Sequence, residues 1–356
     1  MKIPALALVL LASLGAPAAL SGCGNSSDEA APTPSATPEQ QATRAVKVYI
    51  QQNLADLHAA AVELQAAAPA PDADGWNATA DKAAVDQMKA AWYKARTAYE
   101  HIEGAIAVLF PEYDASTDER YDGFLGTAPD DYLFDDQGVT GIHAVERILW
   151  SDAIPAPALS FEQGVPGYQA AAFPTNEQEA RDFKEKLTVR LARETGDMGD
   201  QFGPLELDLA TAFRGVVASM SEQVEKITLA SKGREESRYA QYTLADMKAN
   251  VSGGEQIYLA FQPWVLSKGV EGASYDGAIM AGFQRLDDSY KDQGGTALPP
   301  LPAMFNPESP SAEDLATPFG KIFAVVQKES NDSIDGSLSF EMNKAADLLG
   351  LQQLPK

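Results

Sequence analysis

Apolar residues recur at three- and four-residue steps along most of this chain, and this spacing predicts amphipathic α-helices. The first such segment contains Val46, Tyr49, Ile50, Leu54, Leu57, Ala61 and Leu64. The second, which we expect to end at Pro111, contains Val85, Met88, Trp92, Ala95, Tyr99, Ile102 and Ile106. Further helical patterns cover residues 139–151, 177–196, 205–231, 242–266, 274–290, 311–328 and 338–350. Because alternating strand patterns are scarce, we expect an all-α fold, with sites formed by side chains that point inward from facing helices.

The N-terminal segment carries targeting information. Lys2 precedes an apolar run over residues 5–20, which is too short for a permanent membrane helix and ends in Leu20-Ser21-Gly22-Cys23. This pattern resembles a bacterial lipoprotein signal over residues 1–22, and it implies that lipid is attached to Cys23. An ordinary secretory signal with an incidental cysteine is the alternative. Residues 23–38, rich in Ser, Ala, Pro and Thr, read as a flexible tether.

The mature chain is therefore expected outside the cytoplasm, anchored to a membrane through lipid alone. Gly24 follows the cysteine, and lipoprotein behaviour then favours the outer membrane if the cell is Gram-negative. Cys23 is the only cysteine, so the domain has no disulfide and no thiolate ligand. The formal net charge of −24 argues against binding to nucleic acid or anionic lipid and favours binding of cations. The alternative is that the charge only keeps the protein soluble.

Two helix bundles are expected, over residues 39–165 and 166–356, separated near a Pro/Gly-rich stretch at residues 155–174. A weak internal repeat supports this division. Gly138-Val-Thr-Gly-Ile-His-Ala-Val-Glu146 lies parallel to Asn250-Val-Ser-Gly-Gly-Glu-Gln-Ile-Tyr258. If the repeat is real, the histidine and glutamate of the first bundle are replaced in the second.

One of the three histidines stands in Gly141-Ile-His143-Ala-Val-Glu146. Residues three apart on a helix share a face, so His143 and Glu146 can converge on one point. An imidazole nitrogen beside a carboxylate suits a first-row transition metal. The absent side chain of Gly141 would let another helix or a ligand approach closely. A surface His/Glu pair of no function has the same spacing and is the alternative.

Acidic residues precede this motif. Residues 111–140 contain Glu112, Asp114, Asp118, Glu119, Asp122, Asp130, Asp131, Asp135 and Asp136, and such a run is usually a solvated loop. Glu103 lies on the predicted second helix beside Ile102 and Ile106, so it can face inward. A buried carboxylate needs a partner, which can be a metal or an arginine such as Arg96 or Arg147.

Three segments together resemble the imelysin superfamily, and within it the EfeO/EfeM-type periplasmic lipoproteins of iron uptake. They are Tyr99-Glu-His-Ile-Glu103, Asp118-Glu-Arg-Tyr-Asp122 and the Gly-x-His-x-x-Glu motif at residues 141–146. Residues 242–253, Tyr-Thr-Leu-Ala-Asp-Met-Lys-Ala-Asn-Val-Ser-Gly, resemble a further segment of that family, and the likeness extends over residues 42–350. Gln241-Tyr242 stands where the iron-uptake branch usually has Ser-His, and Gly104 replaces a common proline.

The resemblance implies a metal centre for iron or zinc. Its ligands would be His143 and Glu146, with Glu103 and an acid of the 118–122 segment, Asp118 or Asp122, as companions. The implied function is iron uptake, with the metal passed to an iron permease or a haem-peroxidase partner. Two alternatives stay open. One is an imelysin-like metallopeptidase, although no His-Glu-x-x-His motif is present. The other is a lipoprotein that binds a peptide or glycan without metal.

Overall fold

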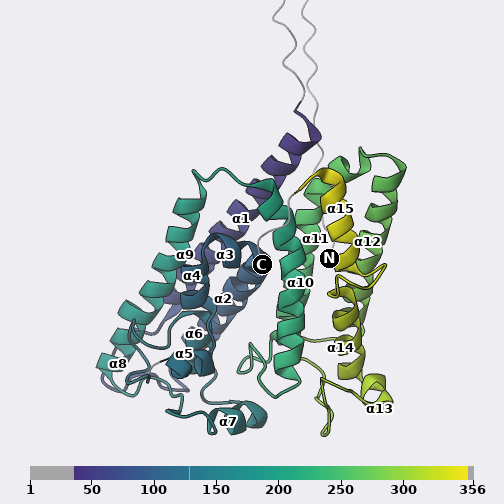
Figure 1. The fold of residues 1–356 in the computed structure, drawn as a ribbon. Coiled ribbons are helices and arrows are strands. Elements are labelled where there is room, and N and C mark those ends of the chain that lie inside the picture. The colour runs from purple at the N-terminus through teal and green to yellow at the C-terminus, as the bar shows by residue number, and fades with distance from the viewer. Residues whose placement is uncertain (1–35, 128, 352–356) are drawn as a thin grey trace, which may run out of the picture. The chain divides into compact units, whose positions relative to one another are not determined.

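The computed structural model describes residues 36–127 and 129–351, and within these ranges all regular structure is helical (Figure 1). The prediction of an all-α fold is confirmed. Cys23 and the signal segment lie outside the described residues. The described residues from Ala36 onward form one compact unit, and the predicted bundle boundary at residue 165 and the internal repeat stay predictions. Within the described part of the chain, no helix has the length and apolar character needed to cross a membrane.

The long helix α1 (Pro38–Ala67) packs between α2 (Lys82–Glu100) and α9 (Thr188–Phe202), and α11 (Thr243–Leu266) packs against both α1 and α2. A capping box fixes the start of α1: the Thr37 hydroxyl accepts a hydrogen bond from the backbone amide of Gln40, and the Gln40 side chain accepts one from the backbone amide of Thr37. The buried face of α1 repeats the predicted three- and four-residue spacing.

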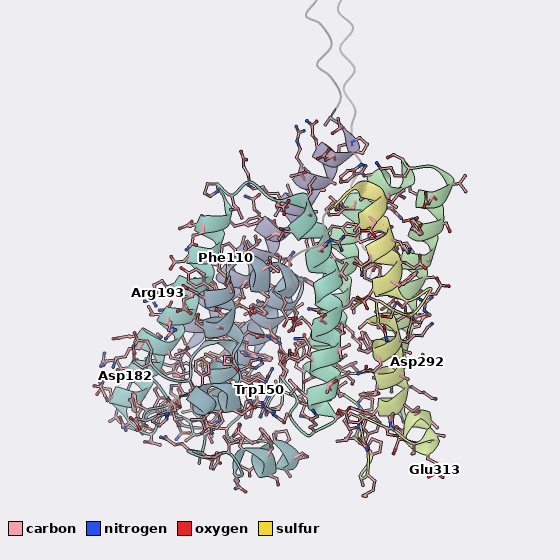
Figure 2. The ribbon with its side chains drawn as sticks, viewed as in Figure 1. Phe110, Trp150, Asp182, Arg193, Asp292 and Glu313 are labelled. Carbon is pink, nitrogen blue, oxygen red and sulfur yellow. The ribbon has the colours of Figure 1, made fainter. Side chains whose placement is uncertain are left out.

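The second half of the chain supplies α10 (Leu209–Ala230), which lies beside α11 and also contacts α3 (Glu103–Leu109). Side chains fill the space between the helices (Figure 2). The other elements after residue 150 are α7 (Ala156–Glu162), α8 (Glu177–Asp182), the π-helical η1 (Phe183–Leu187), α12 (Val270–Lys291), α13 (Ala312–Ala316), α14 (Pro318–Glu329) and α15 (Leu338–Leu349).

The predicted second helix is interrupted before Pro111, which corrects the sequence expectation. α2 ends at Glu100 and α3 begins at Glu103. The backbone of His101, in the gap, packs directly on Gly253 of α11, where a Cβ atom would lie 2.1 Å from the His101 carbonyl oxygen. The interruption therefore lets two helices touch through their backbones, and it leaves Glu100 and Glu103 buried on either side of it.

The acidic segment at residues 111–140 is not simply the solvated loop that its composition indicates. It contains α4 (Pro111–Asp118) and α5 (Tyr121–Thr127), and Asp130 is buried. The end of α4 lies against the start of α6 (Gly141–Leu149). Gly141 has a φ of +83°, and a Cβ atom on it would lie 2.3 Å from the Thr117 carbonyl oxygen. Only glycine permits both this conformation and this contact.

Every residue of α6 is buried. The indole N–H of Trp92 on α2 donates to the Ile142 carbonyl oxygen at 2.9 Å, and the rings of Trp92 and Trp150 pack edge to face with centroids 5.2 Å apart. These contacts hold α6 against α2. As a result, the short helix that carries the histidine motif has fixed neighbours on both sides.

Candidate metal centre

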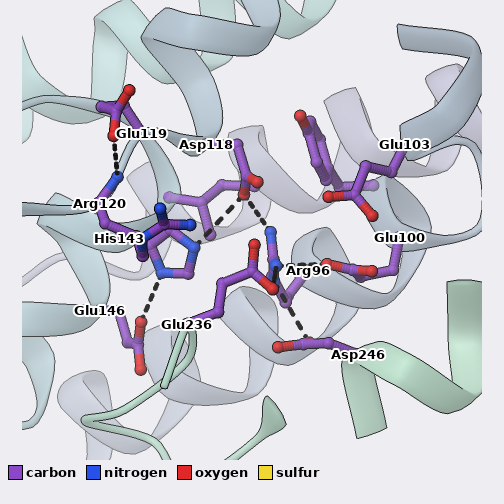
Figure 3. Close-up of polar contacts among 12 residues, drawn as sticks. Arg96, Glu100, Glu103, Asp118, Glu119, Arg120, His143, Glu146, Glu236 and Asp246 are labelled. Carbon is purple, nitrogen blue, oxygen red and sulfur yellow. Dashed lines mark hydrogen bonds and ion pairs between the residues drawn. The ribbon is translucent and has the colours of Figure 1, made fainter. Parts of the chain in front are cut away.

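His143 lies in the first turn of the buried helix α6, with its ring between two carboxylates (Figure 3). On one side, Nδ1 lies 2.8 Å from Oε2 of Glu146. The other oxygen of Glu146 accepts hydrogen bonds from the backbone amides of Tyr239, at 3.0 Å, and Ala240, at 2.8 Å. Although burial raises the pKa of Glu146, His143 and the Ala240 amide favour its ionised form, and we therefore assign the ring proton to Nδ1, as the donor to this carboxylate. The lone pair of Nε2 is therefore free.

The Nε2 atom faces Oδ1 of Asp118 at 3.4 Å and has no hydrogen-bond partner. The His143 side chain is 1% exposed, and burial lowers the pKa of its imidazole, so the ring is neutral at pH 7. Two acceptors thus face each other with no proton between them. Two ligand atoms of one tetrahedral ion, each about 2.1 Å from it, are about 3.4 Å apart. The arrangement fits a metal ion between Nε2 and Asp118.

Glu236 completes this group. Ligand atoms of Asp118, His143 and Glu236 all lie within 4.8 Å of one another. Glu236 comes from the connection between α10 and α11, as do the amides of Tyr239 and Ala240 that hold Glu146. One loop therefore supplies both a carboxylate of this group and the amides that hold Glu146 behind the histidine. These acidic and imidazole groups can hold a metal ion.

A second group of carboxylates adjoins the first and shares Glu236 with it. Its members are Glu100, Glu236 and Asp246, all buried and again within 4.8 Å of one another. The buried guanidinium of Arg96 lies among them, with Nε 3.3 Å from Asp246 and an amino nitrogen 3.2 Å from Glu236. Arg96 also forms ion pairs with Glu100 and Asp118. This protein cation therefore pairs with members of both groups, since Asp118 and Glu236 belong to the first, and the Asp118 oxygen that it contacts is the one that faces His143.

Lys226 of α10 supplies the second buried cation. Its ammonium lies 3.1 Å from Glu100, 2.9 Å from Glu103 and 2.5 Å from Glu236. Although burial raises the pKa of Glu236, the positive charges of Lys226 and Arg96 bring it below its ordinary value. Glu236 is therefore ionised at neutral pH, with Lys226 and Arg96 as its counterions.

Negative groups outnumber the positive ones in this cluster. The carboxyl groups are those of Glu100, Glu103, Asp118, Glu146, Glu236 and Asp246, and the protein cations are Arg96 and Lys226. Burial raises the pKa of Asp118 to about 6 and that of Asp246 to about 7, although Arg96 acts in the opposite direction on both. Carboxyl groups that hold protons near neutral pH indicate a deficit of positive charge, which a bound metal ion would reduce.

Two predicted companions occupy other environments. Glu103 accepts from the ammonium of Lys226 and from the side-chain amide of Asn250, at 2.9 Å and 2.5 Å. The cation that pairs with Glu103 is thus a lysine. The two arginines suggested from the sequence pair with other carboxylates: Arg96 with those described above, and Arg147 with Glu162 at 3.3 Å.

Asp122 forms ion pairs with Arg234 and Arg238. Despite burial, which acts in the opposite direction, these cations lower its pKa to about 2. The structure therefore places Asp118 on the Nε2 side of the His143 ring and Glu146 on its Nδ1 side. Glu103 contacts Lys226, and Asp122 belongs to a separate cluster with Arg234 and Arg238.

Sequence reasoning missed Glu236, Glu100 and Asp246. Glu100 and Asp246 stand inside the segments at residues 99–103 and 242–253, so those segments carried a signal for them. Glu236 stands in Gly233-Arg-Glu-Glu-Ser-Arg238, a charged stretch between two helices, and nothing in its spacing distinguishes it from a solvated loop.

A family model described as Imelysin, a peptidase family by its designation, matches residues 50–301, which include every residue of both carboxylate groups. No curated protein matches the chain.

Proposed function

Because the chain belongs to the imelysin family, we propose that it is a lipid-anchored, extracytoplasmic metal-binding protein of the EfeO/EfeM type that serves iron uptake. The observation that carries the proposal is the free Nε2 atom of His143, buried and 3.4 Å from a carboxylate oxygen of Asp118. A buried ring nitrogen without a partner is costly unless something binds it.

We assign His143, Asp118 and Glu236 as ligands and Glu146 as the residue that orients the imidazole. Metal-binding histidines almost always donate their second ring N–H to a carboxylate or carbonyl, which fixes the tautomer. One imidazole and two carboxylates, with no thiolate, suit iron or zinc and bind less tightly than sites rich in cysteine. Moderate affinity suits a protein that passes its metal on to a permease or a haem-peroxidase partner.

The anchor is part of the proposal. Lipid on Cys23 would keep the domain at the membrane where such a partner lies. Mass spectrometry of the mature N-terminus tests this, together with the distribution of a Cys23→Ala variant between membrane and soluble fractions. A variant that still sediments with membranes would contradict it.

A metallopeptidase is the second candidate, because the matching family carries a peptidase designation. Hydrolysis requires an open metal position and a base that activates water. Both oxygens of Glu146 accept hydrogen bonds, and the other histidines are engaged, His58 with the Ala192 carbonyl at 2.9 Å and His101 with Asn53 at 3.1 Å. These contacts favour binding over hydrolysis. Peptide hydrolysis that is lost in His143→Ala would reverse this preference.

Calorimetric titration tests the metal site directly. The domain, purified without metal or affinity-tag histidines, is titrated with Zn(II), and with Fe(II) under anaerobic conditions. We expect His143→Ala and Asp118→Asn to lose at least about 100-fold in affinity. His58→Ala, which removes a histidine from a different part of the bundle, serves as the matched control and retains wild-type affinity. Equal affinities in the wild type and His143→Ala would end the assignment.

A further inference from the structure

A polar pocket of about 220 Å³ leads to the metal centre. Two proposed ligands, Asp118 and Glu236, line its inner wall, together with Lys226. These side chains are nearly buried: the exposed fraction is 13% for Asp118 and 5% for Glu236. The free Nε2 atom of His143 lies directly behind Asp118 and is aimed at it. The pocket therefore ends at Asp118 and Glu236, and the Nε2 atom of His143 lies 3.4 Å beyond an Asp118 oxygen.

The outer part of the pocket is formed by α10 and by the residues that follow α4. Glu222 and Glu225 lie one helical turn apart on α10 and both line the pocket. Glu225 is at the solvent side, with 54% of its side chain exposed, and pairs with Arg120 across 3.5 Å. Exposure thus decreases from Glu225 through Asp118 to His143. This gradient describes a path from solvent to the metal.

Seven carboxyl groups and only two cations line the pocket. The carboxyl groups belong to Glu103, Asp114, Asp118, Glu119, Glu222, Glu225 and Glu236, and the cations are Arg120 and Lys226. Such walls concentrate cations and repel anions. With a liquid volume of about 30 Å³ per water molecule, the pocket has room for an ion and part of its hydration shell. An anionic organic chelate meets walls of its own charge in a space of that size.

We propose that the pocket admits the metal as a hydrated cation and excludes anionic chelates, and that Glu222 and Glu225 capture the ion without ligating it. This inference rests on the proposed metal site and specifies the form in which its substrate arrives. Burial and the nearby Glu103 raise the pKa of Glu222 to about 8, so Glu225 supplies the negative charge at neutral pH and Glu222 adds its own as the pH reaches and passes about 8. The two glutamates act on the rate of association, because they lie on the path and not at its end.

Stopped-flow measurement of Co(II) binding, followed by visible absorbance at about pH 8, tests the capture step. In a Glu222→Gln/Glu225→Gln double variant we expect the association rate constant to fall about tenfold at low salt, with the dissociation rate constant unchanged. High salt should remove most of the difference, since it screens exposed charges. Arg120→Gln, which removes a positive charge from the rim of the pocket, should raise the association rate constant.

The matched control is Glu308→Gln/Glu313→Gln, which removes two exposed acids outside the pocket; Glu313 lies on α13 (Figure 2). It should bind Co(II) at the wild-type rate. If the pocket variant and this control have equal association rates, the capture proposal is wrong although the metal site stands. If the wild type does not bind Co(II), or binds it no better than His143→Ala, the proposed function itself fails.

A second arm tests the form of the substrate. The domain is loaded with ferric citrate that contains radiolabelled citrate, and bound material is separated by gel filtration. We expect iron without citrate in the protein fraction. Label that co-elutes in stoichiometric amount with iron would overturn the exclusion of chelates.

Discussion

Glu146 accepts the Nδ1 proton of His143 at 2.8 Å, on the side of the ring opposite Asp118. The two residues of the Gly-x-His-x-x-Glu motif thus contact each other, as their helical spacing allows, and their joint ligation of a metal stays a prediction. The glutamate fixes the tautomer that leaves Nε2 unprotonated. In the proposed site the motif supplies one ligand and the residue that orients it, and the other proposed ligands, Asp118 and Glu236, come from elsewhere in the fold.

Glu146→Gln separates these roles. The glutamine oxygen can still accept from the amides of Tyr239 and Ala240, but its NH₂ group then faces Nδ1 and forces the proton onto Nε2. We expect metal affinity to fall about 10–100-fold, as for other residues that orient a ligand, while the melting temperature of the metal-free protein changes little. Calorimetry and melting curves measure both. Unchanged affinity would show that the tautomer does not matter.

Gly141→Ala tests how the centre is assembled. The new Cβ atom would lie 2.3 Å from the Thr117 carbonyl oxygen, at a residue whose φ of +83° disfavours a side chain. We expect a loss of about 3 kcal/mol or more in the free energy of unfolding, from strain and the backbone clash together. Because Thr117 precedes Asp118, the metal affinity should fall as well. Gly199→Ala, in open space on α9, is the control and should be close to neutral.

The sequence predicts helices well here because their signals are local. The apolar spacing of α1 and α6 depends only on residues within each helix. The interruption between α2 and α3 is different, because it depends on Gly253 of a helix far along the chain. No pattern within residues 85–110 records that contact.

The site divides in the same way. His143 and Asp118 stand in recognisable motifs. The contact between the two segments depends on Gly141, which belongs to the same motif as His143. Glu236 and Lys226 enter from a loop and a helix more than eighty residues later, so their arrival is a property of the packing. The role of Glu146 also could not be read from spacing, since an i, i+3 pair can share a metal or hydrogen-bond to one another.

Lys226→Met removes the cation that competes with a metal for Glu236. Leaving three buried carboxylates without their lysine should cost the metal-free protein about 3–5 kcal/mol. The same loss of positive charge should raise metal affinity by about tenfold or more. The increase in melting temperature on adding Zn(II) should therefore be larger than in wild type. Lys232→Met, at an exposed position after α10, is the control, and an affinity decrease in Lys226→Met would contradict the argument.

Stability should depend on pH in a direction that the buried carboxyl groups set. Burial raises the pKa of Asp114 and of Asp246 to about 7 in the folded protein, whereas an unfolded aspartate has a pKa near about 3.9. Between these values the folded state holds more protons than the unfolded state, so the free energy of unfolding falls as pH rises toward and through about 7.

The buried histidines oppose this trend only below their unfolded pKa. Burial lowers the pKa of His101 and of His143, and such groups lose stability as pH falls below about 6.5. From pH of about 6.5 to 8.5 the carboxyl groups therefore dominate, and we expect the metal-free domain to melt at progressively lower temperature. A bound metal supplies the missing positive charge, so its stabilising effect should be larger at the upper end of this range. Asp246→Asn, which cannot ionise, should reduce the slope. A melting temperature that rises with pH in the metal-free wild type would show that these carboxyl groups are ionised without cost, and that the cluster has no need of a further cation.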